Sequence, residues 1–102
     1  MNKNQEKVKK FIKQNNLRTE IEIRILDLFS EIGELAKEVL VGTSYGKQRF
    51  VTTDEITEEI GDAYFSLIEV ANTLRIDMDD ALTASLSKYE KRIKEKGDPG
   101  SK

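Results

Sequence analysis

The 102-residue sequence contains no cysteine, no histidine and no tryptophan, and it has a single proline. Without cysteine and histidine, the chain lacks the ligands of an ordinary zinc or iron–sulfur site, a cysteine nucleophile and a Ser-His-Asp triad. Any catalysis must therefore use carboxylates, hydroxyls, lysine, arginine and hard metal ions. The lack of cysteine also fits a reducing cytoplasm, although by itself it does not establish one.

A charge excess and long apolar runs are missing as well. The chain has 17 Lys and Arg against 19 Asp and Glu, a net charge of −2, which is too even to indicate general nucleic-acid binding. No apolar run approaches the roughly 18–20 residues of a membrane span, and the N-terminus has no signal-peptide-like apolar segment. We therefore expect a soluble, cytoplasmic protein without nucleic-acid or membrane partners. Residues 1–96 should form a single domain, and residues 97–102 a flexible tail.

Apolar residues recur at helical spacing along four segments, which predicts an all-α fold. The expected helices span residues 3–15, 19–42, 53–74 and 77–96. Their predicted N-terminal caps are a capping box of Thr19 with Glu22, a second box of Thr52 with Glu55, and Asp77. In the last helix, the residues expected on the buried side are Met78, Leu82, Leu86, Tyr89 and Ile93.

Short connections favour a four-helix bundle-like subunit. The apolar stripes of the second and third helices are long relative to what one small subunit can cover. We therefore expect a homodimer or a homotetramer, with a monomeric antiparallel bundle as the alternative.

A repeated tetrapeptide is the most informative motif, because residues 31–34 (Glu-Ile-Gly-Glu) return almost unchanged at residues 59–62 (Glu-Ile-Gly-Asp). Acids three apart share one helix face, and like charges at this spacing destabilise a helix by roughly 0.2–0.5 kcal/mol per pair. Helical projection places two acidic lines beside the core stripes, one of Asp27, Glu31, Glu34 and Glu38, the other of Glu55, Glu59, Asp62 and Glu69. We expect a cation, Mg²⁺, between them; the alternative is a pair of solvated acidic faces.

This pattern resembles the MazG-type all-α nucleoside triphosphate pyrophosphohydrolases, whose signature is E-x-x-E followed some two dozen residues later by E-x-x-D. The resemblance covers residues 19–92 and includes the flanking segments 31–36, 58–62 and 75–81. It implies cleavage of NTP or dNTP to NMP or dNMP and pyrophosphate, with a housecleaning role. The metal ligands that it implies, for Mg²⁺ or a substituting Mn²⁺, are Glu31, Glu34, Glu59 and Asp62.

Other roles are less defined by the motif. Glu38 is the nearest candidate for the general base, and its alternatives are a surface acid or a further metal ligand. Phosphate contacts are expected from Lys88, Lys91 and Arg92, and from Lys47 in the loop. Base-stacking candidates are Tyr45, Phe50 and Phe65, although aromatic residues of this kind are more often core or dimer contacts. The chain departs from the family at Ser30, where a second glutamate is common, and at Tyr89, where asparagine is common.

Two other functions fit the same residues. Phosphoribosyl-ATP pyrophosphohydrolase belongs to the same superfamily, but its second motif usually has alanine where this chain has Gly61. A helical dimerisation or nucleotide-sensing module, which binds without turnover, would also account for the apolar stripes.

Overall fold

The computed structural model describes residues 1–100, and these form four α-helices without a β-strand. The helices are α1 (Lys3–Gln14), α2 (Ile21–Gly42), α3 (Asp54–Thr73) and α4 (Met78–Lys96). The all-α prediction is confirmed. Residues 97–100, in the expected tail, lie beyond the last helix, and residues 101–102 lie outside the described part of the chain.

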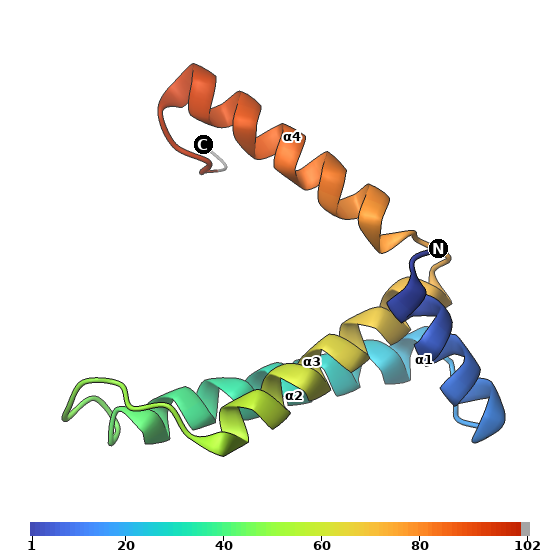
Figure 1. The fold of residues 1–102 in the computed structure, drawn as a ribbon, viewed down its shortest axis with the longest axis horizontal. Helices are drawn as coiled ribbons and strands as arrows, with labels where there is room; N and C mark the ends of the chain where they lie inside the picture. The colour runs from blue at the N-terminus through green and yellow to red at the C-terminus, as the bar shows by residue number, and fades with distance from the viewer. Residues whose placement is uncertain (101–102) are drawn as a thin grey trace.

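The arrangement is a long α2–α3 hairpin with α1 packed against its open end (Figure 1). α4 leaves the end of α3 and diverges from the hairpin, so that the described chain measures 43 × 39 × 23 Å. The expected four-helix bundle is therefore not closed within one chain. Among the described helices, none is long and apolar enough to cross a membrane.

The core is small and is centred on one stretch of α3. Its buried apolar residues are Ile68, Val70 and Ala71, and buried polar residues beside them are Gln5, Ser66 and Glu69. Many large apolar side chains of α2 and α3 are exposed, including Leu26 and Phe29 at 66% and 72%. The hairpin thus leaves much of its apolar surface without a partner in this chain.

The prediction of a buried side on α4 was wrong for the single chain, because no residue of α4 is buried. Leu82, Leu86, Tyr89 and Ile93 are between 40% and 59% exposed. An apolar stripe indicates that a helix face needs cover, but it does not specify which molecule supplies that cover.

The helix ends match the sequence only in part. Asp77 caps α4 as predicted, since its Oδ1 accepts a hydrogen bond from the backbone N–H of Asp80 at 3.0 Å. Both capping boxes were wrong, because α2 and α3 begin after Glu20 and Thr53, and neither N-cap makes a side-chain capping bond. The Thr53 hydroxyl instead donates to Glu38 Oε2 at 3.4 Å, between α2 and α3 at the loop end of the hairpin.

The C-terminus of α3 turns sharply through a non-glycine residue. Arg75 has a φ of 58°, in the left-handed region that terminates helices. The N–H of Ile76 donates to the carbonyl of Ala71 at 2.9 Å, which satisfies one of the helix-end carbonyls. This turn sets where α4 begins.

Gly42 lets the loop after α2 fold back on the helix end. A Cβ at this position would lie 2.6 Å from Phe50 Cε1 and 2.8 Å from the Val51 carbonyl oxygen. The Val51 N–H also donates to the Gly42 carbonyl at 2.8 Å. Backbone therefore approaches backbone here too closely for any side chain.

Gly42→Ala should destabilise the fold by about 1–3 kcal/mol, because the added methyl forces the loop away from α2. Gly33→Ala is the matched control, since a Cβ at Gly33 meets nothing within 4 Å. That control should stabilise its helix by roughly 0.5–1 kcal/mol. Thermal unfolding of the two variants beside the parent checks the contrast, and equal melting temperatures would contradict it.

A candidate metal centre on the hairpin

Three carboxylates from the two acidic repeats converge on the hairpin. Glu31 comes from α2, and Glu59 and Asp62 come from α3, three residues apart on one helical face. One oxygen atom from each carboxylate lies within 4.8 Å of the others. Antiparallel packing of the two helices thus joins repeats that are far apart in the sequence.

Glu59 is the residue whose environment most requires a cation. Its Oε2 atom is buried and has no hydrogen-bond partner. Burial raises the pKa of this carboxyl, and the charges of Asp62, Glu34, Glu31 and Glu38 raise it further. No ion pair within residues 1–100 involves Glu31, Glu59 or Asp62. An orphaned carboxylate oxygen among like charges fits a hard divalent ion with oxygen ligands, such as Mg²⁺ or Mn²⁺.

The other two predicted acids lie beside this cluster. Glu34 is exposed and is not among the three converging carboxylates, although its charge acts on the pKa of Glu59. Glu38 is half-buried and accepts the hydrogen bond from Thr53 described above. The roles of Glu34 as a ligand and Glu38 as a base stay predictions.

The predicted phosphate-binding cations do not gather at the acids within one chain. Lys88, Lys91 and Arg92 belong to α4, which diverges from the hairpin (Figure 1). Lys88 Nζ and Arg92 Cζ lie 5.0 and 5.8 Å from the centre of the Tyr89 ring. Lys47 is exposed in the loop between α2 and α3.

The three aromatic residues predicted to stack on a base lie in different parts of the structure. Phe65 packs edge-on against Phe11 of α1, with ring centroids 5.8 Å apart, and therefore helps to hold α1 on α3. Tyr45 and Phe50 lie in the α2–α3 loop and are 65% and 46% exposed.

Arg24 is the charged partner that the sequence analysis missed. It forms a buried ion pair with Glu69 of α3, and its Nη2 lies 3.3 Å from Asp27 Oδ2. For Asp27 and Glu69, two members of the acidic lines, the positive partner is therefore this arginine, whereas the sequence analysis expected Mg²⁺ between the lines. The i,i+3 spacing of Arg24 and Asp27 was the available signal; the bond to Glu69 spans 45 positions and had no local signal.

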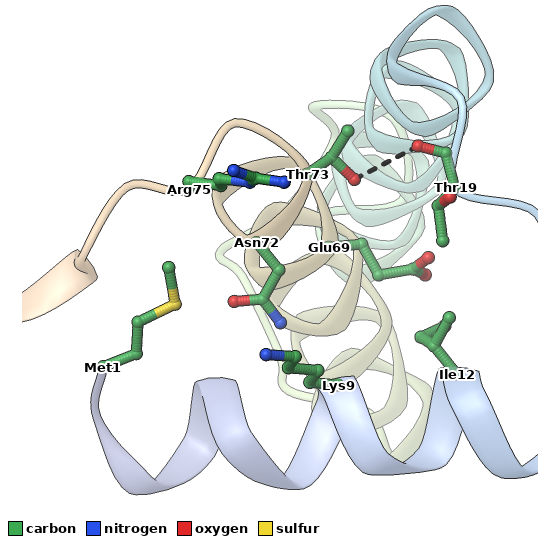
Figure 2. Close-up of a pocket in the computed structure, with 8 residues that line it drawn as sticks. All are labelled: Met1, Lys9, Ile12, Thr19, Glu69, Asn72, Thr73 and Arg75. Atoms are coloured by element: carbon green, nitrogen blue, oxygen red, sulfur yellow. Dashed lines mark hydrogen bonds between the residues drawn. The ribbon is translucent and has the colours of Figure 1, made fainter.

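A cavity of about 540 Å³ lies near the other end of α3, away from the acid cluster. Figure 2 shows its lining, in which Asn72 and Glu69 project from α3 above Lys9 and Ile12 of α1. The hydroxyl of Thr73 donates to the carbonyl of Thr19 at 3.3 Å across its edge. None of the three converging carboxylates lines this cavity.

Comparison with known proteins defines the family. A profile of the MazG nucleotide pyrophosphohydrolase domain matches residues 19–96, which include α2, α3 and α4. The chain belongs to this family.

A relative is uncharacterized protein YpjD of Bacillus subtilis (strain 168), which is 39% identical over 72 residues. The match covers 68% of this chain and 63% of the relative, so it spans less than two thirds of that protein. No solved structure gives a significant match.

Metal binding can be measured without any substrate. Mg²⁺ should raise the melting temperature by a few degrees, because it binds the folded acid cluster and not the unfolded chain. Glu59→Gln should abolish this rise. The matched control is Glu58→Gln, which removes an exposed neighbouring acid of equal charge and should keep the rise. Equal responses of the two variants would argue against the cluster.

The affinity for Mg²⁺ should also depend on pH. Metal binding requires ionised carboxylates, and the pKa of Glu59 is raised, so protons compete for this site at a higher pH than at an ordinary glutamate. Calorimetric Mg²⁺ titrations at decreasing pH should show affinity falling. An affinity that does not change as pH is lowered through the acid range would contradict this assignment.

Arg24→Leu should destabilise the fold by about 3 kcal/mol, because it leaves the carboxylate of Glu69 buried and uncompensated. Burial already raises the pKa of Glu69, and Arg24 opposes that rise. In the variant the folded state therefore favours the protonated acid, so stability falls as pH rises through that pKa and recovers at lower pH. Denaturant unfolding at several pH values measures this. Arg18→Leu, which removes an exposed arginine, should change little.

Proposed function

We propose that this chain is a Mg²⁺-dependent nucleoside triphosphate pyrophosphohydrolase that releases pyrophosphate and a nucleoside monophosphate. Membership of the MazG family supports the class of reaction. The single observation that carries the proposal is the convergence of Glu31, Glu59 and Asp62, with an unpartnered oxygen on Glu59. Carboxylates held together without a protein cation are suited to a metal–triphosphate substrate.

The chain's own residues then have distinct roles. Glu31, Glu59 and Asp62, with Glu34 completing the set, would hold the ion on the hairpin. When bound, Mg²⁺ supplies positive charge for the phosphate oxygens and favours an ionised water nucleophile. Glu38 would accept the proton of the water that cleaves the α–β anhydride, and the Thr53 hydroxyl would orient Glu38 through their hydrogen bond.

Phosphate binding and assembly complete the proposal. Lys88, Lys91, Arg92 and Lys47 carry the charge that the triphosphate needs, and none of these four forms an ion pair within residues 1–100. The exposed apolar faces of α2, α3 and α4 support self-association as a homodimer or homotetramer.

The test is pyrophosphate release from a panel of canonical and modified NTPs and dNTPs with Mg²⁺. Glu59→Gln should lower the rate by more than the roughly 10–100-fold that loss of an outer-shell partner of a metal ligand costs. Glu58→Gln, again the matched control, should stay close to the parent rate.

The two alternative functions are tested by adding phosphoribosyl-ATP to this panel and by measuring nucleotide binding beside turnover. Turnover of phosphoribosyl-ATP alone would favour the histidine-biosynthesis enzyme. A lack of turnover with every substrate, combined with nucleotide binding that Glu59→Gln leaves unchanged, would favour a sensing or dimerisation module.

A further inference from the structure

Gln5 is the most completely buried large side chain of the described residues, with 1% of its surface exposed. Its Nε2 donates to Asn72 Oδ1 at 3.0 Å and to the Ile76 carbonyl at 2.7 Å. Its Oε1 accepts from the backbone N–H of Met78 at 2.8 Å. The Asn72 amide returns a bond to the Gln5 carbonyl at 3.0 Å. One side chain from α1 thus binds the end of α3, the connector and the start of α4.

We propose that Gln5 is a positioning residue that sets the direction in which α4 leaves α3. Met78 is the first residue of α4, and its N–H is one of the groups that a helix start leaves without an intrahelical partner. Gln5 satisfies that group and also the Ile76 carbonyl next to Arg75, the residue with left-handed backbone. The same side-chain amide is therefore bonded both to the connector, at Ile76, and to the first residue of α4.

Packing does not hold α4 in this direction within the chain. None of its residues is buried, and it diverges from the hairpin (Figure 1). Two further contacts come from the residues just before α1. Asn2 Nδ2 donates an exposed bond to Asp79 Oδ1 at 3.1 Å, and the Met1 amino group lies 3.5 Å from Asp77 Oδ2. The orientation of α4 accordingly depends on polar contacts around its N-terminus, and Gln5 makes the buried hydrogen bonds among them.

The clip formed by Gln5 and Asn72 joins α1 to the part of the chain that the family profile matches, because that match begins at residue 19, after α1 ends, and includes Asn72. α1 is itself held on α3 by Phe11 against Phe65 and by Asn4 Nδ2 donating to Tyr64 Oη at 2.8 Å. The clip therefore couples an anchored α1 to the helix that carries Lys88, Lys91 and Arg92. Any effect of the clip on triphosphate binding rests on the proposed function. Its effect on the direction of α4 does not depend on that function.

The absence of cysteine makes a direct distance measurement possible. Spin labels at Lys37→Cys on α2 and Glu90→Cys on α4, both exposed, report the angle between the hairpin and α4. Labelled chain is diluted with unlabelled chain, so that only distances within one chain are observed. The parent should give one narrow distance distribution, and Gln5→Met, which keeps the volume but removes both hydrogen-bonding groups, should broaden it.

Two further variants separate positioning from general stability. Gln14→Met makes the same change at an exposed position of α1 and should leave the distribution narrow. Gln5→Glu keeps the acceptor for Met78 but loses both donated bonds when ionised and regains one of them when protonated. Its distribution should therefore be broad at neutral pH and narrower on acidification. If Gln5→Met does not fold, Gln5→Glu decides the question.

A broad parent distribution would overturn the proposal, and so would a narrow distribution for folded Gln5→Met or for Gln5→Glu at neutral pH. If the chain hydrolyses triphosphates, Gln5→Met should also raise KM by about fivefold or more with little change in kcat. Its half-saturation with Mg²⁺ should not move, whereas a general loss of structure would weaken Mg²⁺ binding and kcat together. Because the distances need no substrate, they test the clip even if no triphosphate is turned over.

Discussion

The buried ion pair between Arg24 and Glu69 fixes how α2 lies against α3, and the candidate metal centre depends on that register. A buried carboxylate is tolerated only when it is paired, so sliding one helix along the other would leave both charges stranded. At the far end of the hairpin, the close approach of Val51 to Gly42 ties the loop to α2. Between these two constraints, Glu31 is held opposite Glu59 and Asp62.

The acid cluster is the opposite kind of interaction, since its members repel one another and Glu59 has an unpartnered oxygen. The folded chain tolerates this repulsion only because packing elsewhere in the hairpin stabilises the fold by more than the repulsion costs. Carboxylates held in such unfavourable surroundings are concentrated at functional sites. The hairpin supplies that packing through Ile68, Val70 and Ala71 on α3. The same helix pair thus provides both the packing of the hairpin and the candidate metal centre.

Outside the hairpin core, the main feature of the chain is apolar surface that a single subunit does not cover. Apolar side chains stay exposed along α2, α3 and α4, and α4 is directed by hydrogen bonds from α1 instead of by a core. An assembly of copies would bury the open faces, and it would receive α4 at an angle already set within each chain. Because so much apolar surface is left uncovered within one chain, the described chain has few buried residues for its length.

The sequence by itself determined the all-α class and the helix boundaries to within one or two residues, because helical periodicity is a local property. It also pointed to the two acidic repeats, from which three of the four predicted acids, Glu31, Glu59 and Asp62, come together. It did not foresee the bond of Arg24 to Glu69 or of Gln5 to Asn72 and Met78, which join residues 45 to 73 positions apart. It also assigned α4 a buried side and predicted two capping boxes that do not form. Only the tertiary structure decided these features, because a polar side chain or an apolar stripe can be satisfied by several partners, and packing selects one of them.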